Sequence, residues 1–136
     1  MGEERKTYDL EQRLIEFATL IILITENIYK NKAGNHISGQ LVRSGTAPAL
    51  YYGEAQSAES RADFIHKIKI ILKELRESRI SLLIIKKVPL SDKMFLIERA
   101  IDECQELIAI FRKSADKPVK TWNRVQANFD IPYSLE

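Results

Sequence analysis

Residues 60–87 read SRADFIHKIKIILKELRESRISLLIIKK, and this stretch decides the fold class. Its apolar residues recur every three or four positions for three heptads, which is the spacing of one helix face rather than of a strand. The members of this row are Phe64, Ile68, Ile71, Leu75, Leu82 and Ile85, with the polar Ser78 among them. Ser60 followed by Asp63 is the signature of a helix N-cap. The stretch therefore predicts a long helix that packs in a bundle.

Three further segments with helical periodicity flank this one. The predicted helices cover residues 9–30, 36–57, 60–87 and 91–115, and residues 117–136, which lack a clear period, are predicted to form an irregular tail. The second segment contains Pro48 near its middle, where a proline costs a helix about 3 kcal/mol, but its small residues suit close helix contact. Because no segment alternates as a strand does, we predict an all-α, up-down-up-down four-helix bundle in which residues 1–136 form a single domain.

Composition excludes several classes of protein. The 136 residues are 45% hydrophobic, enough for a core, and one cysteine excludes an internal disulfide. Two histidines and one cysteine also argue against a structural zinc site. No apolar run reaches the roughly 20 residues of a membrane span, and the N-terminus does not resemble a secretory signal. We expect a cytoplasmic protein with no cofactor, no metal and no membrane association.

The net charge of +2 hides a basic third helix. Residues 61–87 contain eight basic residues against three acidic ones, a net of +5. His66, Lys69, Lys73 and Arg76 follow one another at three- and four-residue steps, so they share one stripe of the helix. Such a stripe can bind phosphates with an affinity that falls with salt, or it can simply be a solvated helix face.

Catalytic constellations are absent from the sequence. There is no glycine-rich phosphate loop, and Cys104 lies in the apolar row of its helix. Three carboxylates, Glu98, Glu103 and Glu106, lack the Glu-x-x-His pairs of a di-iron site and are interpreted as solvated. Asp63 precedes His66 by one helical turn and could orient its imidazole, but no nucleophile can be placed beside the pair. We predict that the protein is not an enzyme.

Several short motifs resemble one known family. They are Arg43-Ser44-Gly45-Thr46, Glu54-Ala55, Ser60-Arg61-Ala62-Asp63-Phe64-Ile65-His66-Lys67 and Leu72-Lys73-Glu74-Leu75-Arg76-Glu77-Ser78. This pattern is similar to that of small bacterial four-helix-bundle proteins encoded in intervening sequences of 23S ribosomal RNA genes. The resemblance implies a helical second segment despite Pro48 and a ring-shaped homopentamer, and it supplies no catalytic residue. One branch of that family works with a reverse transcriptase and its RNA.

The family motifs and the basic stripe together mark candidate site residues. The candidates for nucleic-acid binding are Arg43, Arg61, Lys67, Lys69, Lys73 and Arg76. The candidates for a polar surface or interface are Ser44, Glu54, Asp63, Glu74 and Glu77. Arg43, Glu54, Asp63 and Glu77 could alternatively pair between helices or subunits and hold the helix register.

Two functional hypotheses follow from these residues. The first is a non-catalytic oligomer, a pentamer by resemblance, that binds RNA or a ribonucleoprotein through its basic third helix. The alternative is a structural protein–protein interaction module with no nucleic-acid binding. A small-molecule site around His66 and Asp63 ranks last.

Overall fold

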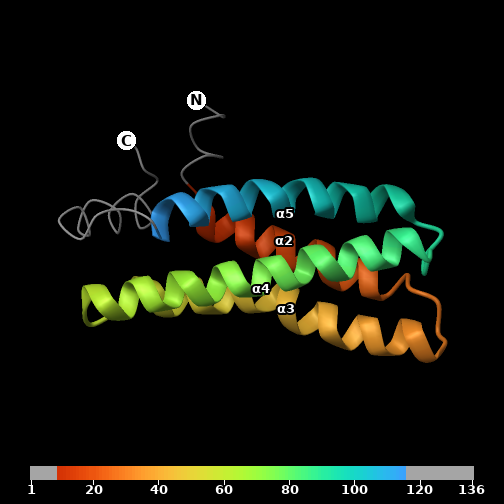
Figure 1. Ribbon diagram of the computed structural model, residues 1–136, viewed down its shortest axis with the longest axis horizontal. Coiled ribbons are helices and arrows are strands. Elements are labelled where there is room, and N and C mark those ends of the chain that lie inside the picture. The colour runs from red at the N-terminus through yellow and green to blue at the C-terminus, as the bar shows by residue number, and fades with distance from the viewer. Residues whose placement is uncertain (1–8, 116–136) are drawn as a thin grey trace.

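The computed structural model describes residues 9–115, which form a four-helix bundle (Figure 1). Its helices are α2 (Leu10–Thr25), α3 (Lys32–Gln56), α4 (Arg61–Lys87) and α5 (Met94–Ala115). The chain reverses direction at each connection, and no strand occurs within these residues. The predicted all-α four-helix bundle is confirmed. The predicted tail at 117–136 lies outside the described residues.

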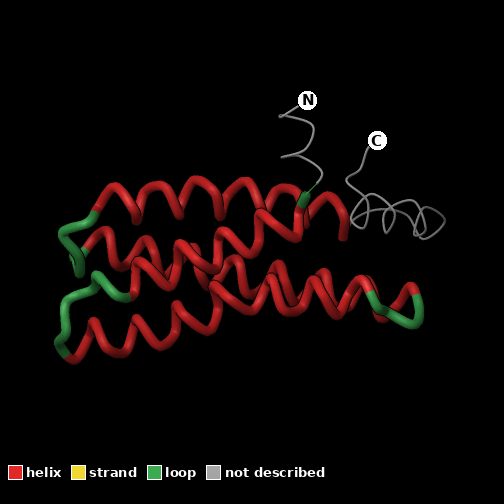
Figure 2. Tube along the Cα trace, turned by 180° about the vertical axis from the view of Figure 1, so that it is seen from behind, coloured by secondary structure: helices red, strands yellow, loops and turns green. Residues whose placement is uncertain are grey.

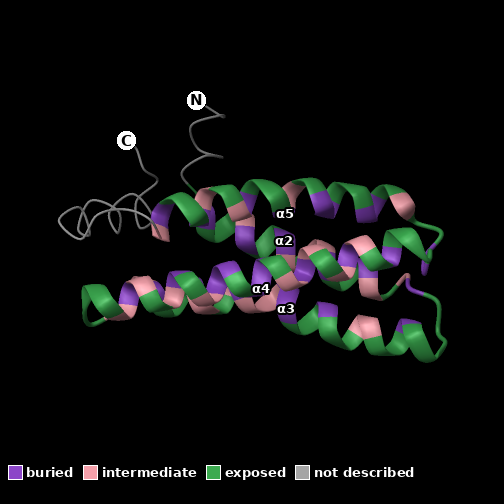
Figure 3. Ribbon diagram, viewed as in Figure 1, coloured by how far each residue is buried: buried purple, intermediate pink, exposed green. Residues whose placement is uncertain are grey.

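Each helix buries one face in a common core (Figure 3). The predicted apolar row of α4 is buried along its whole length, including Ser78, so the helical spacing correctly identified the core face. At one end of the core, Tyr52 of α3 and Phe111 of α5 meet edge to face, with ring centroids 6.1 Å apart. Apolar burial of this kind supplies most of the stabilisation of a bundle, roughly 25 cal/mol per Å².

Helix α3 continues through Pro48, as predicted, and it bends near its middle (Figures 1 and 2). Pro48 is buried and lacks the amide that would otherwise bond to the carbonyl of Ser44. One turn before the proline, Gly45 lies against Ile21 of α2 so closely that an added Cβ would come within 2.7 Å of two Ile21 side-chain carbons. Small residues therefore bring α3 and α2 together where the helix is weakest.

The predicted helix boundaries are wrong on both sides of the connection between α2 and α3. Helix α2 ends at Thr25 rather than at 30, and α3 begins at Lys32 rather than at 36. The backbone N–H of Tyr29 donates to the carbonyl of Leu90 at 2.9 Å, which draws this stretch out of the helix. Asn31 caps α3, because its side chain accepts from the Gly34 amide at 2.7 Å.

The start of α5 also differs from the prediction, since it lies at Met94 rather than at 91. The Ser91 hydroxyl donates to the carbonyl of Asn27 at 2.8 Å and accepts from the Lys93 amide at 3.0 Å. Ser91 thus ties together the two loops at one end of the bundle (Figure 2). Ser60 caps α4 as predicted, accepting from the Asp63 amide at 3.0 Å.

Two glycine substitutions in α3 test the close approach at Gly45. Gly45→Ala should lower the free energy of unfolding by about 1–3 kcal/mol, because the methyl group overpacks against Ile21. Gly39→Ala is the matched control: a Cβ there meets nothing within 4 Å, so alanine should raise stability by about 0.5–1 kcal/mol. Urea denaturation of both variants measures the difference, and shifts in the same direction would contradict this packing.

Candidate nucleic-acid interface

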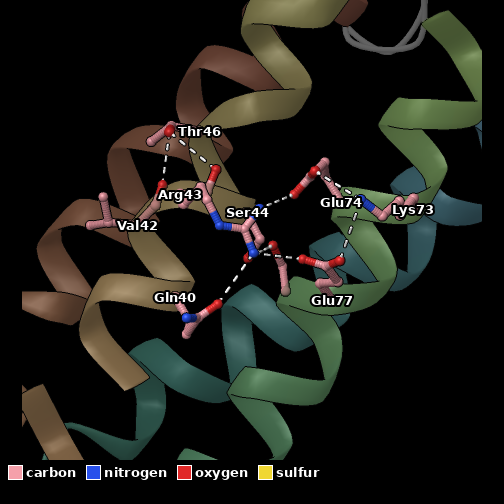
Figure 4. A network of polar contacts seen from close by, with 9 residues as sticks. Gln40, Val42, Arg43, Ser44, Thr46, Lys73, Glu74 and Glu77 are labelled. Atoms are coloured by element: carbon pink, nitrogen blue, oxygen red, sulfur yellow. Dashed lines mark hydrogen bonds and ion pairs between the residues drawn. The ribbon is translucent and has the colours of Figure 1, made fainter. Parts of the chain in front are cut away.

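An arginine on α3 bridges to two glutamates on α4 (Figure 4). Arg43 Nη1 lies 3.0 Å from Glu74 Oε1, and its Nη2 lies 2.8 Å from Glu77 Oε1. The same Nη2 donates to Gln40 Oε1 at 3.2 Å. One guanidinium therefore holds carboxylates one helical turn apart, and this contact aligns α3 with α4.

A buried pair of hydroxyls lies beside this ionic contact. Ser78 Oγ of α4 donates to Ser44 Oγ of α3 at 2.9 Å, and both side chains are shielded from water. Each hydroxyl gives the other a partner, which a buried polar group requires. The single polar residue in the apolar row of α4 is thus explained by its partner across the helix interface.

The arginine also sets the charge states of the cluster. The hydrogen bond from Arg43 lowers the pKa of Glu77 below its ordinary value of 4.5, and the same bond raises the pKa of Arg43. Lys73 lies farther away, with its Nζ 3.8 Å from both Glu74 and Glu77. Arg43 is therefore the main counterion of the two glutamates, and Lys73 extends into solvent.

A second polar cluster joins the same two helices nearer the start of α4. Lys67 Nζ lies 3.4 Å from Glu54 of α3 and 3.4 Å from Asp63 of its own helix. Because the Asp63 carboxylate contacts Lys67, it is not placed to orient His66, whose side chain is exposed. Arg43, Glu54 and Glu77 thus pair between helices of one chain, as in the alternative considered for them, whereas Asp63 pairs within α4.

The six basic candidates fall into two groups. Arg43 and Lys67 bridge α3 and α4, as described above. Arg61, Lys69, Lys73 and Arg76 are exposed, and for Arg61, Lys69 and Arg76 no ion pair forms among residues 9–115. The structure therefore leaves an exposed row of basic side chains on α4, which we call the basic stripe: His66, Lys69, Lys73 and Arg76.

A surface cavity of about 730 Å³ lies between α3 and α4 beside the basic stripe. Its lining is completed by residues that are not among the candidates predicted from the sequence, including His36, Gln40, Ile80 and Ser81. The sequence does contain a pattern that groups these lining residues. His36, Gln40 and Arg43 recur at the spacing of one helix face, and so do Lys73, Glu77 and Ile80. The pattern could not show that these two faces lie opposite each other.

The three glutamates interpreted as solvated are all in ion pairs. Glu98 and Glu106 are exposed to solvent as expected, whereas the Glu103 side chain is only 28% exposed. Glu103 accepts from Arg13 Nε at 3.0 Å and Nη2 at 2.8 Å, and Glu106 lies 2.9 Å from the same Nη2. Glu98 lies 3.6 Å from Lys86. These contacts fasten α5 to α2 and α4, because the folded bundle places cations of other helices beside each carboxylate.

Cys104 is buried, as its place in the apolar row predicted. Its thiol donates to the carbonyl of Leu75 at 3.1 Å, and burial raises its pKa to about 12. A thiol in this environment stays protonated at neutral pH and is a poor nucleophile. Within the described part of the chain, no group of three acidic, histidine or cysteine side chains could hold a metal ion, and no helix is long and apolar enough to span a membrane.

The Arg43–Glu77 bond predicts a pH-dependent contribution to stability. Because the folded state lowers the pKa of Glu77, the bond stabilises the fold above the ordinary pKa and is lost as the pH falls through the lowered one. Glu77→Gln should reduce the free energy of unfolding at pH 7 by up to about 1 kcal/mol, and this deficit should shrink toward zero in acid. Denaturation of both proteins between pH 7 and pH 3 measures it. A deficit that stays constant with pH would contradict this assignment.

Comparison with known proteins shows a relationship at the level of fold. No protein-family model and no curated protein sequence matches the chain. A solved structure does match: a protein of unknown function from the S23 ribosomal protein family of Bacteroides thetaiotaomicron VPI-5482. The alignment has a TM-score of 0.70 and 26% identity, and it covers 79% of this chain and 98% of the other. The chain thus shares its four-helix fold with a protein assigned to a ribosomal family.

Proposed function

We propose that the protein is a non-catalytic, cytoplasmic oligomer that binds RNA or a ribonucleoprotein through the basic stripe of α4. The observation that carries this proposal is that Lys69 and Arg76 are exposed and form no ion pair within residues 9–115. Cations held at intervals along one helix face can neutralise successive phosphates and release their counterions.

The charges around the stripe favour a polyanion. The acidic residues nearest to it on α4, Glu74 and Glu77, share Arg43 as their main counterion, which offsets one of their two negative charges. Asp63 and Glu54 are likewise paired with Lys67. Since α4 carries a net charge of +5, the face it presents to solvent stays positive after these pairs form.

Two resemblances to other proteins also support the proposed RNA binding. The structural neighbour is assigned to the S23 ribosomal protein family, and the sequence motifs resemble proteins encoded in 23S ribosomal RNA intervening sequences. Membership of that second family is part of the proposal.

Two exposed apolar faces support self-association. On α2, Ile15, Ile22 and Leu23 are 44–45% exposed, and Ile84 near the end of α4 and Val88 just after it are exposed as well. Exposed apolar faces of this kind mark contact sites. Because α2 and α4 are diagonal in the bundle, the two faces lie on opposite sides of the molecule. A contact between unlike faces builds a ring when it closes, and the family resemblance suggests five subunits.

The alternative function uses these same apolar faces alone. A protein–protein interaction module would assemble through α2 and α4 and would not bind nucleic acid, with the basic stripe serving only as a solvated face. RNA binding therefore separates the two functions.

Removing the basic stripe should abolish salt-dependent RNA binding. The affinity of the purified protein for a single-stranded RNA should fall at least tenfold between about 50 and 200 mM salt. In a Lys69→Ala/Lys73→Ala/Arg76→Ala variant, the slope of log affinity against log salt should drop by about 2, because each phosphate contact on a single strand contributes about 0.7. Fluorescence anisotropy titrations measure both quantities.

A variant with equal charge loss controls for net charge. Arg99→Ala/Arg112→Ala/Lys113→Ala also removes three exposed cations, but from α5, and it should retain both the affinity and the salt slope. Equal effects of the two triple variants would contradict a specific role for α4. No binding by the unmodified protein at low salt would leave the interaction module as the better function.

Charged substitutions on the two apolar faces test the assembly. Ile22→Lys and Ile84→Lys each place a charge at an exposed position, so each variant should remain helical but lose assembly. Mixing the two should restore a single contact and give a dimer, because each variant keeps the face that the other lacks. Light scattering measures the masses, and circular dichroism checks the fold.

Ala109→Lys on the exposed face of α5 is the control and should assemble like the unmodified protein. If one apolar substitution leaves the mass unchanged, the contact does not join α2 to α4.

A further inference from the structure

The basic stripe leads to the mouth of the cavity between α3 and α4. Its last two members, Lys73 and Arg76, line the cavity, and one turn later the same face of α4 becomes apolar at Ile80. A chain of phosphates that follows the stripe would therefore bring the next part of its ligand to this opening.

The charges inside the cavity differ from those at its mouth. Glu77 lines the cavity, and Arg43 is already bonded to Glu77 and Glu74, so a phosphate inside would face a carboxylate whose nearest cation is occupied. Lys73 and Arg76 make weaker contacts or none within residues 9–115. The cavity thus favours a neutral group inside and anionic groups at the rim.

The hydrogen-bonding groups of the cavity fit the edge of a nucleobase. Glu77 Oε1 accepts from Arg43 at 2.8 Å, whereas Oε2 has Lys73 only at 3.8 Å and keeps its capacity to accept an N–H. Gln40 uses its oxygen to accept from Arg43, which leaves its amide nitrogen to donate. Ser81 adds a hydroxyl that can do either.

Apolar side chains complete the fit. Ile37 of α3 and Ile80 of α4 line the cavity, and they can contact the faces of a planar ring. Its volume of about 730 Å³ lies in the usual range for small-ligand pockets. Nucleic-acid-binding proteins commonly read single strands by taking bases out of the stack and bonding to their edges.

We propose that this cavity binds one unpaired, amino-bearing base of RNA, cytosine above all, while the adjoining phosphates contact Lys73 and Arg76. Glu77 accepts from the cytosine amino group, and Gln40 donates to the ring acceptors beside it. Uracil presents a carbonyl oxygen where cytosine has its amino group, so at this position it has no N–H to donate to the Glu77 carboxylate. This inference rests on the proposed RNA binding and adds a base preference to it.

The test compares two RNAs that carry identical charge. Twelve-nucleotide oligocytidine and oligouridine are titrated at about 50 mM salt and neutral pH into the unmodified protein, Ser81→Trp and Ala109→Trp. The tryptophan at 81 fills the cavity, whereas the tryptophan at 109 adds the same bulk at an exposed position on α5. Circular dichroism and light scattering confirm that fold and mass are unchanged.

We expect oligocytidine to bind about tenfold more tightly than oligouridine, as one good base contact allows. Ser81→Trp should remove this preference and leave the weaker, salt-dependent binding, while Ala109→Trp should keep it. Equal affinities in the unmodified protein, or a preference that survives Ser81→Trp, would overturn the cavity proposal and leave RNA binding by the stripe intact. Binding of neither RNA by the unmodified protein would instead overturn the proposed function itself.

Discussion

The close packing of α3 at Ser44 and Gly45 sets the distances on which the rest of the structure depends. Gly45 allows α3 to reach Ile21 of α2, and on the adjoining side Ser44 meets Ser78 of α4 at 2.9 Å. Larger side chains at these positions would push α3 outward. The short contacts occur just before Pro48, where the helix lacks a backbone bond, so tertiary packing compensates for a weak point in the local structure.

This close approach also explains how charge is distributed on the surface. Because α3 lies so near α4, Arg43 reaches both Glu74 and Glu77, and Lys67 reaches Glu54. The four acidic residues of the α3–α4 face are thereby paired within the chain, and Arg43 and Lys67 offset half of their negative charge. Lys69, Lys73 and Arg76 of α4 stay exposed, and the protein presents a positive face although its net charge is only +2.

The same geometry makes the α3–α4 face chemically uneven along its length. The first part of α4 exposes cations, the middle borders a cavity that contains a paired carboxylate, and the last part exposes Ile84 and Val88. These three regions of α4 suit different ligands: phosphates, a polar ring and an apolar protein surface, in that order. In the proposed functions, this single 27-residue helix serves both assembly and ligand binding.

The sequence by itself determined the fold class, the buried face of α4 and the cap at Ser60, because these depend on spacing within one helix. It also placed the basic stripe on one side of α4. Only the tertiary structure decided where α2 ends, since Tyr29 bonds to Leu90, more than sixty residues away in the chain. It alone separated Arg43 and Lys67 from the exposed cations and placed Gln40 opposite Glu77. Periodicity shows which residues of a helix share a face, but a partner across the bundle depends on the register between helices, which local spacing does not contain.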